Sequence, residues 1–302
     1  MPAPQAASSS SHPATGSAVS LGDAGLLAVL LLVDSMHLVF ARALTPYLDP
    51  VLAATLVLWI ATLQVGVYGI ALRRLALGAI RRNLWSLAAI GLLVGGSTAF
   101  GYMAVGYIDP GTASMLSRMT TIFSIGIGVW WLQERLHRWQ AIGAGLALVG
   151  LLIITFQPGD VLQLGSLLIV GSSLMYAIHA ALVKRYAQGM DFLDFFFGRL
   201  LFTALALSLF TFVWSPITAP VPVAWLLLLA TGTVDVVISR TLYYLALRRL
   251  TVSMHAIILT LSPVATILWS LLFFGAFPTP QQLIGGVIVM VGVGLAAIQR
   301  TT

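Results

Sequence analysis

The side chains most able to do chemistry here are charged or titratable groups inside otherwise apolar segments. Asp34 and His37 lie three residues apart, which places them on one face of a helix. The other charged side chains of this kind are Arg118, Arg199, Asp235 and Arg240. Charges are costly inside a bilayer and usually face a wet cavity or a solute pathway. We therefore expect these residues to form an internal binding site.

The composition sets the class of protein. The chain has 302 residues, 59% of them hydrophobic and only 8% charged, with a mean hydropathy of +1.01. Soluble domains carry roughly a quarter charged residues, so the sequence predicts a polytopic membrane protein. It has no cysteine, which excludes disulfides and thiolate metal sites. It also lacks the phosphate-loop, zinc-protease and serine-hydrolase motifs, so we expect no enzyme activity, no catalytic residue, no metal and no cofactor.

The hydropathy pattern predicts an all-α fold with ten transmembrane helices. Most of the spans have about 20 residues, enough to cross a hydrocarbon core of about 30 Å. The expected spans are 22–43, 51–72, 84–107, 111–133, 139–157, 164–185, 193–215, 223–247, 251–274 and 281–299. Residues 1–20 are small, polar and broken by proline, and they predict a disordered cytoplasmic tail.

The chain contains an internal sequence repeat. A shift of 142 positions places Asp49 on Asp191 and His37 on His179 without a gap. Each copy has five expected spans, so the second must enter the membrane from the opposite side. We predict two inverted five-helix repeats, 21–157 and 158–302, around a central cavity.

The two copies differ in their charges. The same shift places Asp34 on Tyr176 and Arg118 on Thr260. Unmatched charges suggest a specialised site, and we expect Asp34 to pair with Arg118, and Asp235 with Arg199 or Arg240. The alternative is that these pairs only fasten helices together.

The basic residues predict the topology. Eleven of the 15 Lys and Arg residues lie in the even-numbered loops or at the C-terminus, and the opposite side has only Arg42. Positive charge marks cytoplasmic loops, so we expect both termini in the cytoplasm and a multi-pass protein of the cytoplasmic (inner) membrane. The net charge of +6 then reflects topology and contact with the lipid bilayer, and we expect no nucleic-acid partner.

Several further features concern a small-molecule substrate. Span four carries a polar stripe, and His37, whose ordinary pKa of about 6.5 allows titration near neutrality, could couple transport to protons together with Asp34. Aromatic residues near the cavity could cover an apolar solute, or could simply pack. The candidate substrate-binding residues are Asp34, His37, Phe100, Tyr102, Ser114, Arg118, Thr121, Tyr176, His179, Asp235, Arg240, Tyr244 and Trp269.

Two features concern helix mechanics. Pro263 falls in the middle of span nine and is a candidate hinge, because proline frees backbone carbonyls. Glycines cluster in spans five and ten, where small residues let helices approach closely. We expect these two spans to pack or to dimerise, giving a monomer or a weak homodimer.

Two stretches resemble a known family. Residues 132–150, which read LQERLHRWQAIG followed by a glycine-rich apolar run, and residues 261–292 are similar to the EamA-type drug/metabolite transporters. The usual acidic residue after span four is Glu134, but its counterpart in the second copy is Ala276. The resemblance implies ten helices in two inverted halves and secondary export of small metabolites, often amino acids. Overall, the chain looks most like the YddG-type exporters of aromatic amino acids.

The sequence therefore predicts a secondary transporter that exports aromatic or other neutral amino acids by alternating access. The alternatives are a passive channel or facilitator, and an exporter of drugs, nucleosides or sugars.

Overall fold

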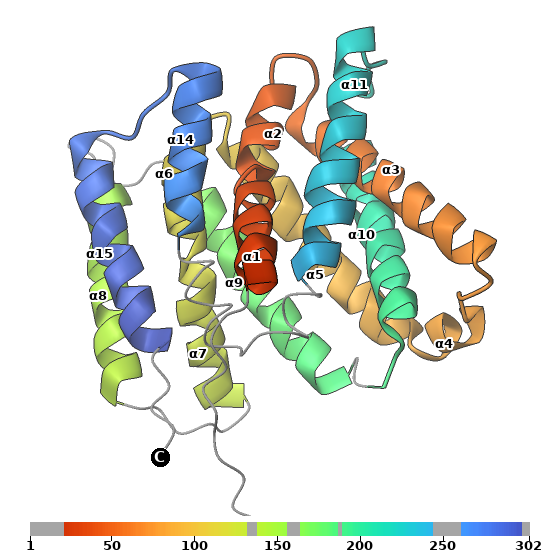
Figure 1. Ribbon diagram of the computed structural model, residues 1–302, viewed down its shortest axis with the longest axis horizontal. Coiled ribbons are helices and arrows are strands. Elements are labelled where there is room, and N and C mark those ends of the chain that lie inside the picture. Colours follow the sequence, from red (N-terminus) through yellow and green to blue (C-terminus); the bar gives the residue numbers. More distant parts are fainter. Residues whose placement is uncertain (1–20, 132–137, 156–163, 187–188, 244–260, 298–302) are drawn as a thin grey trace, which may run out of the picture.

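Every described element of the computed structural model is a helix (Figure 1), as the sequence predicts. The structure describes residues 21–131, 138–155, 164–186, 189–243 and 261–297. The helices are α1 (Leu21–Asp34), α2 (His37–Leu44), α3 (Pro50–Ala71), α4 (Leu77–Arg82), α5 (Leu84–Ala104), α6 (Pro110–Ser117), α7 (Met119–Trp131), α8 (Arg138–Thr155), α9 (Leu164–Tyr186), α10 (Phe192–Trp214), α11 (Pro222–Ala230), the π-helix η1 (Thr231–Ile238), α14 (Ser262–Phe274) and α15 (Pro280–Ala297).

Each of the ten expected spans contains described helix. Within the described residues, five helical stretches are long and apolar enough to cross a membrane: Pro50–Ala71, Leu84–Ala104, Leu164–Val183, Phe192–Trp214 and Pro222–Tyr243. The protein is therefore a multi-pass membrane protein. The total of ten crossings stays a prediction, because the other apolar helices are shorter or interrupted.

Aspartates at the membrane ends of the helices begin three of the elements. The Asp49 carboxylate accepts from the backbone N–H of Val51 at 3.0 Å, at the start of α3. Asp109 begins α6 and Asp191 begins α10 in the same way. Capping satisfies backbone donors that the first turn leaves without partners. The match of Asp49 with Asp191 in the two copies is thus explained by equivalent helix starts.

Equivalent helices of the two copies pack against each other. The pairs are α3 with α10 and α8 with α15, and α6 of span four packs against α14 of span nine. The members of a pair run in opposite directions: α3 begins at the upper end of Figure 1 and α10 at the lower end. This arrangement agrees with a second copy that is inverted relative to the first.

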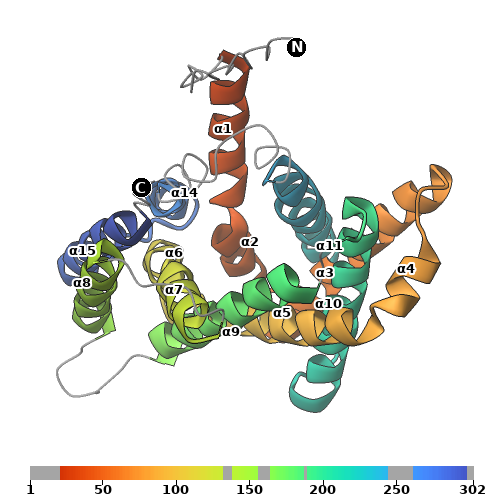
Figure 2. The same ribbon diagram turned by 90° about the horizontal axis from the view of Figure 1, so that it is seen from below.

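The glycines of spans five and ten let these two spans pack closely against each other within the chain. A Cβ atom on Gly150 would lie 2.6 Å from the carbonyl oxygen of Gly285, and one on Gly292 would lie 2.6 Å from the backbone nitrogen of Ala147. Helices α8 and α15 therefore touch backbone to backbone, and Figure 2 shows them side by side at the edge of the molecule. Their use in a homodimer stays a prediction.

Three of the expected spans are not continuous α-helices. Span one is broken at Ser35 and Met36, between α1 and α2, and span four at Arg118, between α6 and α7. Span eight passes from α11 into η1, which contains Asp235. Broken helices expose backbone groups at the binding sites of transporters, and π-helical segments often occur at functional sites. In each of the three spans, a charged residue lies at the irregular segment or directly beside it.

Pro263 lies in the first turn of α14, which begins at Ser262. The first turn tolerates proline, because its N–H would have no helical partner there. The preceding residues 251–260 lie outside the described residues, so the hinge role of Pro263 stays a prediction.

Candidate functional site

A polar cavity of about 370 Å³ lies where the three irregular spans meet. Helices of both copies line it, including α10, which carries Arg199. Its wall is rich in hydroxyl groups, contributed by Ser35, Ser97, Thr98, Ser114, Ser117, Thr120, Thr121, Ser172, Ser173, Thr203, Ser262 and Thr266. Such a wall offers many hydrogen-bonding groups to a polar solute.

His37 and Asp235 form the first ion pair on this wall. His37 Nδ1 lies 2.7 Å from Asp235 Oδ2, and the exposed fractions of the two side chains are 34% and 2%. The edge of the Tyr102 ring faces His37, with ring centroids 6.1 Å apart. Asp235 Oδ1 and the Tyr102 hydroxyl are buried without a hydrogen-bond partner in the described part of the chain. His37, Asp235 and Tyr102 thus form a compact cluster of titratable groups.

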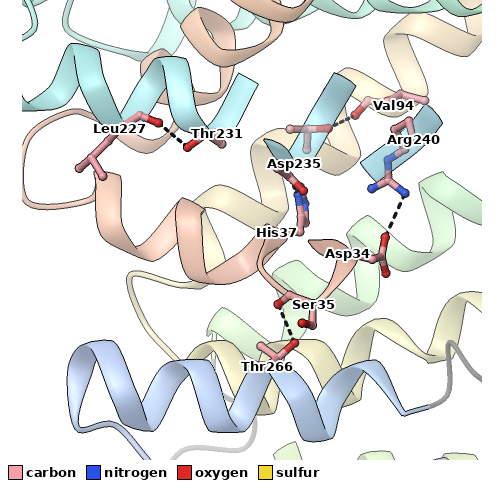
Figure 3. A network of polar contacts seen from close by, with 10 residues as sticks. Asp34, Ser35, His37, Val94, Leu227, Thr231, Asp235, Arg240 and Thr266 are labelled. Atoms are coloured by element: carbon pink, nitrogen blue, oxygen red, sulfur yellow. Dashed lines mark hydrogen bonds and ion pairs between the residues drawn. The ribbon is translucent and has the colours of Figure 1, made fainter. Parts of the chain in front are cut away.

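Asp34 and Arg240 form the second ion pair. Arg240 donates from Nη1 to Asp34 Oδ1 at 3.4 Å, and both side chains are mostly buried. Figure 3 shows both pairs beside the break in span one. Each pair joins a residue of the first copy to a residue of the second. Both pairs therefore link the two copies at this point of the cavity wall.

These pairings differ from those expected from the sequence. We expected Asp34 to pair with Arg118 and Asp235 with Arg199 or Arg240, whereas the ion pairs are Asp34 with Arg240 and Asp235 with His37. The expected pairs assumed continuous α-helices, and the breaks change both the height and the direction of the side chains. Arg118 still lines the cavity, at the junction of α6 and α7.

The break in span one is held by α14. The Thr266 hydroxyl lies 2.9 Å from the Ser35 carbonyl oxygen, and Trp269 Nε1 donates to the Ser35 hydroxyl at 3.0 Å. A carbonyl freed by a helix break needs such a partner, because no water is available in the hydrocarbon core. Trp269 therefore supports the cavity through Ser35 and is not itself part of the wall.

Arg199 is among the charges expected inside apolar spans, but the list of candidate substrate-binding residues omits it. It lies in α10 with an exposed fraction of 8%, and its Nη2 lies 3.5 Å from the Tyr176 hydroxyl oxygen. Its guanidinium also stands 6.0 Å from the centre of the Tyr176 ring. The available signal was its charge within an apolar span, the same signal that identified Arg118 and Arg240.

The other candidates fall into four groups. The cavity wall includes Asp34, His37, Tyr102, Ser114, Arg118, Thr121, Tyr176, Asp235 and Arg240. Phe100 instead lines a separate, mainly apolar cavity of about 630 Å³. His179 is buried, with Nδ1 3.2 Å from the Tyr176 carbonyl oxygen, and does not line the polar cavity. Tyr244 lies outside the described residues.

The larger, apolar cavity is a weaker candidate for the solute site. Its wall includes Pro50, Val51, Phe210 and Trp214, at the ends of α3 and α10. Asp49, its acidic residue, already accepts hydrogen bonds from the first turn of α3. The polar cavity is the one that brings charged groups of both copies together.

The fold and the cavity define a helical membrane protein built from two copies of one unit, with charged groups gathered between the copies. The model of the EamA-like transporter family matches residues 23–156 and 163–298. The chain therefore belongs to the EamA-like transporter family, and it is a membrane transporter of the drug/metabolite superfamily.

The chain is also similar to two individual proteins. The chain is 32% identical over 80 residues to a UPF0060 membrane protein of Nocardia farcinica (strain IFM 10152), covering 26% of this chain and 69% of that protein. A solved crystal structure, described only as that of a protein, aligns with a TM-score of 0.65 at 21% identity, covering 91% of this chain and 96% of the other. That likeness supports the fold.

Proposed function

We propose that this protein is a secondary transporter that exports a small metabolite by alternating access, with amino acids as the leading substrate class. One observation carries the proposal: a polar cavity between two copies of a transporter unit is lined by ion pairs that run from one copy to the other. Such contacts can form in one state of the protein and break in the next.

The size and chemistry of the cavity favour a small zwitterionic solute. A volume of about 370 Å³ is at the small end of ligand pockets, which span roughly 300–1,000 Å³. Charges of both signs suit an ammonium and a carboxylate group, while Tyr102, Tyr176 and Tyr243 offer aromatic surface to an apolar side chain. Drugs, nucleosides and sugars remain the competing substrates.

Proton coupling would act at His37. Its imidazole bonds to Asp235 across the two copies and is the more exposed member of the pair. Protonation strengthens this pair and deprotonation weakens it, so a proton could bias the contact between copies. We therefore retain His37 as the coupling residue, with Asp235 rather than Asp34 as its partner.

We place the protein in the cytoplasmic (inner) membrane with both termini in the cytoplasm. The basic residues Arg73, Arg74, Arg81 and Arg82 flank or belong to α4, at the lower end of Figure 1. The natural chain has no cysteine, so single cysteines can be introduced without background. A membrane-impermeant thiol reagent should label a cysteine at Arg81 only from the cytoplasmic side, and one at Tyr47 only from the opposite side.

Counterflow in proteoliposomes tests transport directly. Liposomes are loaded with an unlabelled amino-acid mixture, and labelled tryptophan, phenylalanine, methionine or threonine is added outside. A carrier gives saturable uptake with an overshoot, and Asp34→Asn should lose it while the exposed Arg81→Gln variant keeps it. Flux that does not saturate and does not respond to internal solute would instead identify a channel. Saturable counterflow of nucleosides, sugars or drugs, without counterflow of amino acids, would contradict the amino-acid assignment.

A further inference from the structure

Arg199 is a buried cation with few partners. It is 92% buried, taken from its exposed fraction of 8%, yet it borders the cavity. Within the described residues, the ion pairs of the cavity carboxylates are Asp34 with Arg240 and Asp235 with His37, and neither includes Arg199. Asp194, one turn away on α10, instead accepts from the backbone N–H of Ala76 at 2.8 Å.

The hydrogen bonding of Arg199 leaves donors available. A guanidinium carries five N–H donors, and the contact of Arg199 with a side-chain acceptor in the described chain is the Tyr176 hydroxyl at 3.5 Å. When that hydroxyl oxygen accepts from Arg199, its own hydrogen is free to donate elsewhere. Arg199 and Tyr176 thus present an N–H and an O–H side by side at the cavity.

The neighbouring Thr203 hydroxyl is not available to donate a hydrogen bond to a solute. The Thr203 hydroxyl donates to the Arg199 carbonyl oxygen at 2.7 Å, one turn back on α10. Its single hydrogen is therefore engaged by the backbone. The donors that remain for a solute at this point of the wall are those of Arg199 and Tyr176.

The charges of the cavity also call for an anion. Its wall holds three arginines (Arg118, Arg199 and Arg240) and two aspartates (Asp34 and Asp235). Both aspartates are already paired, Asp34 with Arg240 and Asp235 with His37, so neither neutralises the charge of Arg199. A buried charge is tolerated when it is paired and hydrogen-bonded, and a solute carboxylate would supply both at once.

We propose that Arg199 and Tyr176 form the carboxylate-binding subsite of the transported solute. A carboxylate has two oxygens, and the paired N–H and O–H donors can each reach one of them; charge-assisted bonds of this kind are the strong ones. The inference rests on the proposed transport function and narrows its substrates to solutes that carry an acid group. It excludes sugars and cationic drugs that lack one.

Only the second copy contributes residues to this subsite. The residue equivalent to Arg199 in the first copy is Val57, which is fully buried, and the residue equivalent to Tyr176 is Asp34. The cavity therefore has a cationic wall from α9 and α10 without a symmetric counterpart. A zwitterion would bind in one orientation, with its carboxylate at Arg199 and its ammonium group directed away from it.

Binding of matched ligands to the purified full-length protein tests the proposal. Phenylalanine and 3-phenylpropionate carry the carboxylate, whereas phenylalaninamide and phenethylamine lack it. Titration calorimetry in detergent should show binding of both acids and binding at least ten-fold weaker for the amide and the amine. Arg199→Gln should weaken binding of the acids by about 10- to 100-fold, the loss expected for a charged hydrogen bond, while the exposed Arg81→Gln variant matches the natural chain.

Two milder variants cover the chance that Arg199→Gln fails to fold. Arg199→Lys keeps the charge but removes the paired N–H geometry, and Tyr176→Phe removes one donor and keeps the ring. Each should weaken binding of the acids by several-fold and leave the amide unaffected. Equal binding of acid and amide, unchanged affinity in both variants, or failure of every carboxylate to bind would overturn the proposal.

Failure of the proposed transport function and failure of the carboxylate subsite give different results. Acids that bind through Arg199 but show no counterflow would refute transport and leave the carboxylate subsite standing. Saturable counterflow of an uncharged or purely cationic solute that Arg199→Lys does not change would support transport and overturn the subsite.

Discussion

Gly292 in α15 should tolerate no side chain, while Gly294, two residues further along the same helix, should accept alanine. A Cβ on Gly292 would meet the backbone nitrogen of Ala147 and the carbonyl oxygen of Gly143, both at 2.6 Å. A Cβ on Gly294 would meet nothing within 4 Å. Backbone atoms cannot swing aside as a side chain can, so the Gly292→Ala variant must push α8 and α15 apart.

The comparison of the two variants isolates this cost. Alanine favours a helix over glycine by about 0.5–1 kcal/mol, and that gain is similar at both positions. Overpacking in a well-packed interface costs about 1–3 kcal/mol, and only Gly292→Ala incurs it. At roughly 2–4 °C per kcal/mol, Gly292→Ala should melt about 2–12 °C below Gly294→Ala.

The assay is thermal unfolding of the detergent-purified protein at one fixed scan rate, since membrane proteins often unfold irreversibly. The first copy offers an independent pair: a Cβ on Gly150 would clash with the Gly285 carbonyl oxygen at 2.6 Å, whereas one on Gly145 would meet nothing within 4 Å. Equal melting temperatures within both pairs would refute backbone contact between α8 and α15.

Three further predictions concern the cavity. Asp34→Asn and Arg240→Gln should each lower the melting temperature, and the double variant should lose less than the sum, with a coupling of about 0.5–3 kcal/mol; additive losses would show that the 3.4 Å contact contributes nothing. His37→Gln should abolish acceleration of transport by a pH gradient, whereas His179→Gln, which alters a residue off the cavity wall, should keep it; a gradient response that survives His37→Gln rules out coupling there. Thr266→Val should cost about 1–3 kcal/mol by leaving the buried Ser35 carbonyl without its partner, whereas Thr241→Val, at an exposed hydroxyl, should melt within a degree or two of the natural chain.

Composition and repetition were enough to predict the class and the plan of the fold. A chain with 8% charged residues has too little polar surface for water, so helices in a membrane follow directly. The match of Asp49 with Asp191 persists in both copies because each residue begins a helix. Repeated identities of this kind report shared local structure, and local structure is what a sequence encodes most directly.

The membership of the cavity was also largely predictable, because a charge in an apolar span has few other places to lie. Asp34, Arg118, Asp235 and Arg240 were expected at the site for that reason, and all four line the cavity. The apolar and aromatic candidates were placed less well. Phe100 lines another cavity. An aromatic ring packs equally well against lipid, another helix or a solute, so the residue type does not predict which of these it contacts.

The partners of the charges could not be predicted. The two ion pairs join residues 198 and 206 positions apart, so their choice depends on how the copies pack. Ideal helices of 1.5 Å rise per residue were assumed, but span one breaks at Ser35 and Met36, where neither glycine nor proline marks the break. The break is stabilised by Thr266 and Trp269, more than 200 residues away, and no local pattern reports such support.

The breaks and the charges have a common physical cause. An intact helix satisfies its own backbone and offers a solute only side chains, whereas a broken one adds carbonyl and N–H groups at mid-membrane. Those groups need partners from the other copy, as the Ser35 carbonyl finds in Thr266, and charges placed beside the breaks find theirs there too, as Asp34 does in Arg240. The two ion pairs between the copies both lie at the cavity, whereas α8 and α15 approach each other through glycine backbones. A solute that competes for the polar contacts can then change how the copies fit together without disturbing the glycine-packed periphery.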